Sequence, residues 1–398
     1  MSELITVVLV GVGGYGNFYV NALLDCKTRE DYRIIGIVEP NPAGCLRLKE
    51  LLSKNIPLYN SLEDFYTESH ADLAIISSPI QFHARQIVTA VTKNTHVLCE
   101  KPLCATVQEG KEIIAVKKST DKLVSVGYQW SFSEAILELK KDIISGRLGR
   151  PLRLKTIVLW PRDFAYYRRN TWAGKIKDAQ GNWVLDSVVN NATAHFLHNM
   201  FFVLGQNYGE SALPSIVTAE LYRANEIENY DTAALRIQTT DGTELLYYAS
   251  HATLKKLEPV FCFEFEEAVV NYNQNLGKNI VATFKNGEKR VYGDPFARRD
   301  NKIWMTMEAI KAGKDVPCGP EAALAQVICV NGIQEVGAIF SFPDEFIRVQ
   351  TDELGEKTGL YVAGLDQVLT ECYEQWKLPS ETGVTWAREG KTKNFLEE

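Results

Sequence analysis

"LITVVLVGVGGYGNFYVNALLDC", residues 4–26, joins a strand pattern, a glycine-rich turn and a helix pattern in one short run. Its apolar, β-branched start predicts a buried strand, and its end repeats apolar side chains at helical spacing. Between the two lies a G-x-G-x-x-G motif made by Gly11, Gly13, Gly14, Tyr15 and Gly16. Such glycines permit a tight turn and let the backbone approach a pyrophosphate at a helix amino terminus. The run predicts the first β–α unit of a dinucleotide-binding domain, with a tight turn that holds no ligand as the alternative.

A carboxylate follows at the end of the next predicted strand, residues 33–39. Glu39 would hydrogen-bond the ribose hydroxyls of an adenosine and repel a 2′-phosphate. We therefore expect NAD in preference to NADP as the cofactor. A solvated carboxylate at a strand end is the competing interpretation.

The first 128 residues alternate strands with helices. The predicted strands are 4–10, 33–39, 57–59, 72–78, 95–99 and 122–127, and the predicted helices are 16–26, 41–53, 81–92 and 106–118. Short apolar strands separated by helices are typical of a parallel sheet covered on both faces. The sequence predicts an α/β fold that begins with a doubly wound Rossmann domain over residues 1–128.

Longer, alternating strands follow and predict an α+β substrate-binding domain over residues 129–340. These strands are 151–160, 216–223, 232–240, 243–252, 260–272 and 280–286, with an Asp-Gly hairpin turn at 239–244. We expect a large, mainly antiparallel, open-faced sheet with one face covered. Helices near 192–204, 301–312 and 320–338 would pack on it or bridge the domains. Residues 341–398 predict a C-terminal helix and a polar, loop-like tail packed on the domains.

Composition restricts the possible partners. The chain has 398 residues and a net charge of −7, which argues against nucleic acid or an anionic membrane as a partner and favours small solutes. Its eight cysteines are scattered singly, without zinc-ligand spacing. The amino-terminal run predicts a strand and no signal peptide, and no apolar run is long enough for a membrane span. We expect a cytoplasmic protein.

Two other predicted strands end in residues that can take part in binding or catalysis. Ser78 and Pro79 close the strand at 72–78, and Glu100 and Lys101 follow the strand at 95–99. Ligands of such sheets bind at the carboxyl ends of the strands, where Lys101 can reach the nicotinamide edge. A solvated loop lysine is the alternative.

The segment "VNNATAHFLHN", residues 189–199, carries His195 and His198 on a predicted helix. Histidine suits acid–base work because its ordinary pKa lies near neutral pH. Two core histidines bonded to backbone carbonyls are the alternative for this spacing. A metal site needs a third ligand, and the sequence offers no pattern for one, so we expect no metal.

The segment "WPRDFAYYRRNTWAGK", residues 160–175, is rich in aromatic and cationic side chains. Aromatic rings with polar edges suit sugars, and arginine suits a carboxylate or phosphate. The segment predicts these substrate-binding residues: Arg162, Tyr167, Arg168 and Trp172. An oligomer interface has a similar composition and is the alternative.

These motifs together resemble the Gfo/Idh/MocA oxidoreductases, the relatives of glucose–fructose oxidoreductase and inositol dehydrogenase. The resemblance rests on the glycine motif, Glu39, Ser78-Pro79 with His83, Glu100-Lys101-Pro102 and "GRLGRPLRLK" at 146–155, and it covers roughly residues 4–340. It implies an NAD(P)-dependent dehydrogenase or reductase acting on a sugar, inositol or related polyol, as a homodimer or homotetramer. The implied cofactor-binding residues are Gly11, Gly13, Gly14, Tyr15, Gly16, Glu39, Ser78, Pro79, His83, Glu100, Lys101 and Gln129.

The resemblance also implies catalytic roles. Lys101 corresponds to the lysine that polarises the reacting oxygen, and His195 to the helix histidine that acts as acid or base. The family commonly has an aspartate four residues before that histidine, where this chain has Asn191. Asn191 and His198 join the predicted substrate-binding residues, and whether His198, Asp186 or Asn190 replaces the missing carboxylate stays open.

Two other functions remain possible on this fold. One is a redox-neutral glycosidase that oxidises its sugar transiently, eliminates a substituent and reduces the product. The other is a non-catalytic regulator that responds to NAD. Such a regulator would need neither Lys101 nor His195.

Overall fold

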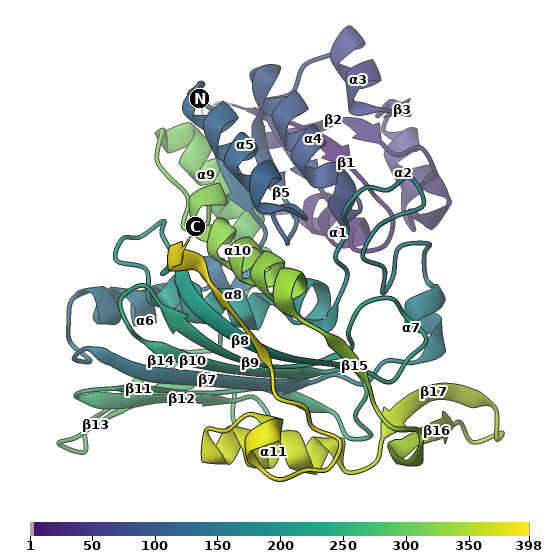
Figure 1. The fold of residues 1–398 in the computed structure, drawn as a ribbon. Helices are drawn as coiled ribbons and strands as arrows, with labels where there is room; N and C mark the ends of the chain where they lie inside the picture. Colours follow the sequence, from purple (N-terminus) through teal and green to yellow (C-terminus); the bar gives the residue numbers. More distant parts are fainter. Residues whose placement is uncertain (1–3, 398) are drawn as a thin grey trace. The chain divides into compact units, whose positions relative to one another are not determined.

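The computed structural model describes residues 4–397, and the contacts divide the chain into two units (Figure 1). The first unit comprises the chain up to Phe132 together with Arg298–Leu324. The second comprises Ser133–Ala297 and the chain from Ala325 onward. The structure thus groups residues 298–324 with the first unit, whereas the sequence division left them in the second domain.

The first unit contains a six-stranded parallel sheet in the order β3-β2-β1-β4-β5-β6. Its strands are β1 (Ile5–Val10), β2 (Tyr32–Val38), β3 (Leu58–Tyr59), β4 (Leu73–Ile76), β5 (His96–Cys99) and β6 (Val124–Val126). The strand order reverses between β1 and β4, and ligands of such sheets bind outside the carboxyl ends of the strands at this switch point. The predicted Rossmann-like parallel sheet is confirmed.

Helices cover this sheet. They are α1 (Gly16–Asp25), α2 (Leu48–Ser53), α3 (Leu62–Glu68), α4 (Ile80–Thr92), α5 (Val107–Lys118) and α9 (Asn301–Ala312). The sequence prediction missed α3, although Ser61 caps it by accepting a hydrogen bond from the Asp64 N–H at 3.0 Å. It placed the helix at 301–312 against the second sheet or between the domains. In the structure α9 packs Ile303, Trp304 and Met307 into the core of the first unit.

The second unit contains a ten-stranded mixed sheet in the order β14-β13-β12-β11-β7-β10-β9-β8-β15, with β18 also paired to β8. Its strands are β7 (Pro151–Leu159), β8 (Pro214–Arg223), β9 (Thr232–Thr239), β10 (Glu244–Ser250), β11 (Leu257–Phe265), β12 (Ala268–Asn273), β13 (Ile280–Phe284), β14 (Lys289–Gly293), β15 (Ile339–Ser341) and β18 (Lys391–Asn394). β7 runs parallel to β10 and β15 parallel to β8, and the other pairs are antiparallel. The predicted fold class, a parallel sheet followed by a mainly antiparallel one, is confirmed, as is the hairpin at 239–244.

One predicted strand is wrong. Residues 260–272 were expected to form a single strand, but they form parts of β11 and β12, which pair as a hairpin. The turn falls at Glu266 and Glu267, and glutamate is not a residue type that favours turns. Distant backbone holds it, because the Glu266 N–H donates to the Arg150 carbonyl at 3.0 Å and the Glu267 N–H to the Leu148 carbonyl at 2.9 Å.

Both faces of the second sheet carry a helix, where the sequence predicted one covered face. The remaining elements are α6 (Glu134–Ile144), α7 (Phe164–Arg168), the π-helical turn η3 (Val188–Ala192), α8 (Ala194–Val203), α10 (Pro320–Val336), α11 (Leu365–Gln375), β16 (Ile347–Thr351) and β17 (Lys357–Val362). The neighbours Tyr247 and Tyr248 on β10 point to opposite faces. The Tyr247 hydroxyl donates to the Thr193 carbonyl beside α8, and the Tyr248 hydroxyl donates to the Cys372 carbonyl of α11. The tail is also more regular than predicted, since β18 pairs with β8 and so joins the sheet.

Candidate functional site

The glycine loop between β1 and α1 is packed closely at two of its glycines. A Cβ at Gly16 would lie 2.2 Å from the Gly11 carbonyl oxygen, and a Cβ at Gly11 would lie 2.8 Å from the backbone of Ser77 and Ser78. The Ser77 hydroxyl donates to the Gly11 carbonyl at 2.6 Å, which ties the end of β4 to this loop. Gly11 and Gly16 are therefore required by the packing of the backbone itself.

The other two glycines face free space. A Cβ at Gly14 would meet nothing within 4 Å among the described residues, and the atoms nearest to one at Gly13 would be those of Gly44, at the ordinary contact distances of 3.6–3.8 Å. No described side chain caps α1, and its first turn has no acidic residue. The positive end of the helix dipole is thus left for an external anion, which fits a dinucleotide pyrophosphate. Tyr15, beside these glycines, is 46% exposed.

Glu39 lies directly after β2, behind the glycine loop. One carboxylate oxygen accepts from the Val12 N–H at 3.1 Å and the other from the Asn41 N–H at 3.0 Å. These two bonds fix the carboxylate at the carboxyl edge of the sheet. Each oxygen keeps a lone pair for a ribose hydroxyl.

His83 connects the ends of β4 and β5. Its Nδ1 lies 2.8 Å from the Pro102 carbonyl oxygen and its Nε2 lies 2.9 Å from the Ser78 carbonyl oxygen. Burial lowers the pKa of His83, although the two carbonyls oppose this change. Pro79 precedes α4, and Gln129 begins the short helix η2 (Gln129–Phe132) after β6, so the predicted cofactor residues follow the carboxyl ends of their strands.

Glu100, at the end of β5, forms a buried ion pair with Lys302 of α9. The Tyr19 hydroxyl donates to the same carboxylate at 2.5 Å, and the Lys101 N–H donates to its other oxygen at 3.2 Å. The Lys302 ammonium also lies 4.8 Å from the centre of the Tyr15 ring. Glu100 therefore holds the backbone of Lys101 through contacts within this unit, and the sequence alone gave no sign of Lys302.

Glu100 and Lys302 each stabilise the charged form of the other. Burial by itself raises the pKa of Glu100, but Lys302, with smaller help from the Tyr19 hydroxyl and the Lys101 charge, brings the pKa below its ordinary value. Burial lowers the pKa of Lys302, but the Glu100 carboxylate and the Tyr15 hydroxyl together outweigh burial, so the pKa is raised. Both groups are consequently charged near neutral pH.

In the second unit, α8 presents His195. Among the described residues of α8, His195 is the one that is not buried. His198 is fully buried, its ring is stacked 5.7 Å from that of Phe202, and burial lowers its pKa to about 3. This position agrees with the packing alternative for His198 and leaves His195 as the accessible histidine of the helix.

The residues before α8 form an unusual backbone. Leu185 is buried at a φ of 51°, a conformation that bulky residues rarely adopt outside functional sites, and η3 is a π-helical turn, which also recurs at such sites. Asp186 is buried and accepts hydrogen bonds from the Gly174 N–H at 2.6 Å and from the Asn191 side chain at 2.7 Å. A carboxylate is thus bonded to the asparagine that replaces the expected aspartate. Asn190 instead donates to the Leu185 carbonyl at 3.1 Å.

The aromatic and cationic segment at 160–175 folds around Tyr166. The guanidinium groups of Arg162 and Arg169 lie 4.5 Å and 3.8 Å from the centre of its ring. Arg168 is exposed and lies 5.4 Å from the Phe164 ring, and Trp172 is half-buried beside Arg169.

Beside this segment lies a small cavity of about 200 Å³, counting its open part. It is lined by Tyr166, Tyr167, Gly174, Asp186, Ser187, Val188, Ile227, Tyr230 and His251. Of the predicted substrate residues it includes Tyr167. His251 and Tyr230 were missed, because His251 lies at the end of an ordinary predicted strand and Tyr230 in the loop before β9, both far from the segment in sequence.

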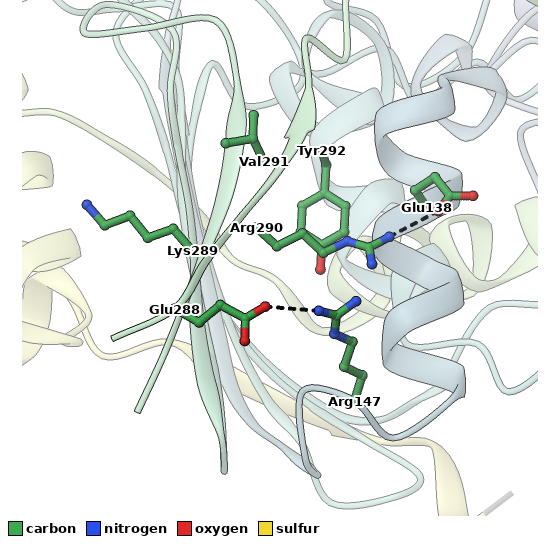
Figure 2. Close-up of a pocket in the computed structure, with 7 residues that line it drawn as sticks. All are labelled: Glu138, Arg147, Glu288, Lys289, Arg290, Val291 and Tyr292. Carbon is green, nitrogen blue, oxygen red and sulfur yellow. Dashed lines mark hydrogen bonds and ion pairs between the residues drawn. The ribbon is translucent and has the colours of Figure 1, made fainter. Parts of the chain in front are cut away.

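A second hollow lies over α6 and β14 (Figure 2). Four of its charged side chains form two pairs: Arg290 bonds Glu138 at 3.0 Å and Arg147 bonds Glu288 at 3.2 Å, while Lys289 points away from them (Figure 2). Because the four charges that face one another are already matched, we do not assign a ligand to this hollow.

Over residues 4–397, no group of three or more histidine, cysteine, aspartate or glutamate residues is arranged to hold a metal ion. Within that range, no helix has the length and apolar character needed to cross a membrane.

The fold and the glycine loop define a two-domain protein with a dinucleotide-binding first domain. Residues 5–128 match the model of the oxidoreductase family with an NAD-binding Rossmann fold, Gfo/Idh/MocA, so the resemblance seen in the motifs is confirmed over these residues. Inositol 2-dehydrogenase of Salmonella typhimurium is 27% identical over 146 residues, which are 36% of this chain and 43% of that protein. The matched part therefore spans less than half the length of this curated relative.

Solved structures extend the likeness to the fold of both units. A levoglucosan dehydrogenase in complex with NADH and levoglucosan has a TM-score of 0.68 at 17% identity, covering 84% of this chain and 97% of that one. The WlbA dehydrogenase of Bordetella pertussis, in complex with NADH and UDP-GlcNAcA, has a TM-score of 0.67 at 19% identity, covering 84% and 96%. At these identities the likeness shows a shared fold.

Proposed function

We propose that the protein is an NAD-dependent oxidoreductase that transfers a hydride between nicotinamide and a sugar, inositol or related polyol. The observation that carries the proposal is the glycine loop with Glu39 and Lys101 at strand ends of a domain that matches an NAD-binding oxidoreductase family. The inositol and levoglucosan dehydrogenases among its relatives support the substrate class. A homodimer or homotetramer in the cytoplasm remains our expectation.

Two side chains of this protein would perform the proton chemistry. When bound, NAD supplies the hydride acceptor. His195, the accessible histidine of α8, would take the proton of the substrate hydroxyl as general base. The Lys101 ammonium, with its backbone held by Glu100, would stabilise the developing alkoxide. In ketone reduction the same groups would work in reverse.

A substrate panel tests the proposed function. The protein would be incubated with NAD and a series of sugars, sugar acids and inositols, and NADH formation followed by absorbance. We expect reduction of NAD with at least one neutral polyhydroxy compound. Release of a glycosidic substituent without net NADH would instead support the redox-neutral glycosidase, and no reaction in either direction would contradict an oxidoreductase of this class.

Two glycine variants should separate folding from cofactor binding. Gly16→Ala would place a Cβ 2.2 Å from the Gly11 carbonyl, so we expect a loss of roughly 1–3 kcal/mol in the free energy of unfolding. The methyl group of Gly13→Ala would have its nearest neighbours in Gly44 at ordinary contact distance, so this variant should leave stability unchanged. Its methyl group would stand where a pyrophosphate approaches the backbone, so its Kd for NADH should rise about tenfold or more. Thermal unfolding and fluorescence titration measure the two effects, and equal NADH affinity in Gly13→Ala and wild type would contradict the assignment.

Glu39 should set the cofactor preference. Glu39→Gln removes the negative charge that opposes a 2′-phosphate, so the ratio of kcat/KM for NAD to that for NADP should fall about tenfold or more. Glu30→Gln is the matched control, since Glu30 is an exposed glutamate before the amino end of the same strand. An unchanged ratio in Glu39→Gln would assign Glu39 to a structural role alone.

A further inference from the structure

The small cavity of the second unit contains polar groups that the fold leaves without partners. Within the part of the chain that the structure describes, neither Nε2 of His251 nor the hydroxyl of Tyr167 has a hydrogen-bond partner. His251 is 2% exposed, and both residues line the cavity. Buried polar atoms normally find a partner, so two such atoms at one cavity indicate a bound polar group.

The state of the His251 ring follows from its other nitrogen. Nδ1 lies 2.8 Å from the Trp160 carbonyl oxygen, which can only accept, so Nδ1 carries the hydrogen. Burial, helped by the charge of Arg162, lowers the pKa of His251 to about 3. The ring is therefore neutral near pH 7, and Nε2 presents a lone pair that accepts a hydrogen bond.

Tyr167 provides the complementary group. Burial raises the pKa of Tyr167 well above its ordinary value, so its hydroxyl keeps its proton and can donate. The cavity also contains the buried Asp186, which disfavours an anion. Arg162 and Arg169 are not among the lining residues. The Arg169 guanidinium forms an ion pair with the Asp186 carboxylate at 3.8 Å and partly offsets its negative charge.

A neutral hydroxyl suits His251, Tyr167 and Asp186 at the same time. It can donate to Nε2 of His251, accept from Tyr167 and stand beside a carboxylate without repulsion. A carboxylate offers no hydrogen to Nε2 and would be repelled by Asp186. Of the cavity's volume, only about 10 Å³ can hold the centre of a water-sized group. That is room for about one hydroxyl or water molecule and too little for a sugar ring.

We propose that the cavity lined by Tyr167, Asp186 and His251 is a specificity subsite that binds one neutral hydroxyl of the substrate. It selects uncharged polyols or sugars over sugar acids. The subsite connects to the proposed catalytic helix through Asp186, which accepts from Asn191, four residues before His195. This inference rests on the proposed function for its substrate class, while its binding test is independent of turnover.

Titration calorimetry with the full chain in the presence of NADH tests the subsite. The neutral probes are levoglucosan, myo-inositol and D-glucose, and the anionic probe is D-glucuronate. Tyr167→Phe removes only the hydroxyl, and it should fold normally because that hydroxyl has no described partner to lose. Tyr208→Phe is the matched control, since Tyr208 is 48% exposed in the same unit.

We expect at least one neutral probe to bind wild type about tenfold or more tightly than D-glucuronate. Its Kd should rise about 3–10-fold in Tyr167→Phe, the loss of one hydrogen bond, and stay unchanged in Tyr208→Phe. Tighter binding of D-glucuronate, no measurable binding of any neutral probe, or a Kd that Tyr167→Phe leaves unchanged would overturn the subsite. A Kd that is unchanged in Tyr167→Phe would indicate that a buried water, and no substrate hydroxyl, occupies the cavity. Tyr167-dependent binding without NAD reduction would contradict the oxidoreductase proposal alone.

Discussion

Replacing Lys101 or His195 with alanine is expected to lower kcat/KM on the best substrate by about 10²–10⁴-fold in each case. His195→Ala removes the group proposed to move the hydroxyl proton, and Lys101→Ala removes the charge proposed to stabilise the alkoxide. Initial rates of NADH formation measure both effects. If the proposed roles hold, the double variant should lose less than the product of the two single losses, because both residues are proposed to act on the same substrate oxygen.

The controls for this prediction match the residue types. His70→Ala and Lys118→Ala replace an exposed histidine and an exposed lysine of the first unit, and their kcat/KM should stay within about twofold of wild type. The NADH affinity of His195→Ala should also be unchanged, which separates a catalytic defect from a folding defect. Rates within about threefold of wild type for both Lys101→Ala and His195→Ala would refute the proposed roles.

Sequence patterns predicted the parts of the fold that local interactions determine. The glycine motif, the strands around it and Glu39 are close in sequence, and the structure brings them together as expected. The hairpin at 239–244 has its signal in its own turn residues. The hairpin of β11 and β12 has no such signal, because Arg150 stabilises its turn from more than 100 residues away, with a 2.8 Å bond to Glu266.

The buried ion pair shows a different limit. Lys302 and Thr306 are polar and four residues apart on α9, so they share one face of the helix. A periodicity argument would predict that this face is exposed to solvent. Both are fully buried, Lys302 against Glu100 and Thr306 with its hydroxyl 2.8 Å from that of Ser125. Each polar group is compensated by a partner about 180–200 positions distant, which no local pattern can reveal.

The proposed subsite lies beyond local patterns for the same reason. Tyr167, Asp186 and His251 belong to three separate segments that only the folded second unit brings together. The sequence marked the Tyr167 segment by composition and raised Asp186 as an open question. His251 gave no signal, because a histidine at the end of a strand is ordinary by type and its missing partner is a property of the folded state.

Lys302→Met is expected to lower the free energy of unfolding by about 3–5 kcal/mol, because it leaves the Glu100 carboxylate buried without its cation. Urea unfolding followed by circular dichroism measures the loss. Lys302→Met combined with Glu100→Gln should be closer to wild type than Lys302→Met alone, since the double variant has no unpaired buried charge. Lys314→Met, at an exposed lysine just beyond α9, should have little effect.

The pH dependence of this loss has a definite sign. Because the pKa of Glu100 is depressed, its contribution is full above its ordinary pKa of 4.5 and is lost as the pH falls through the lower value of the folded state. Because the pKa of Lys302 is raised, its contribution is full below its ordinary pKa of 10.5 and is lost as the pH rises through the higher folded value. The difference between wild type and Lys302→Met should be greatest between these limits and narrow in acid, where Glu100 of the variant takes up a proton. A loss below about 1 kcal/mol at neutral pH, the size typical of exposed pairs, would show that water screens the pair and that Lys302 does not hold Glu100.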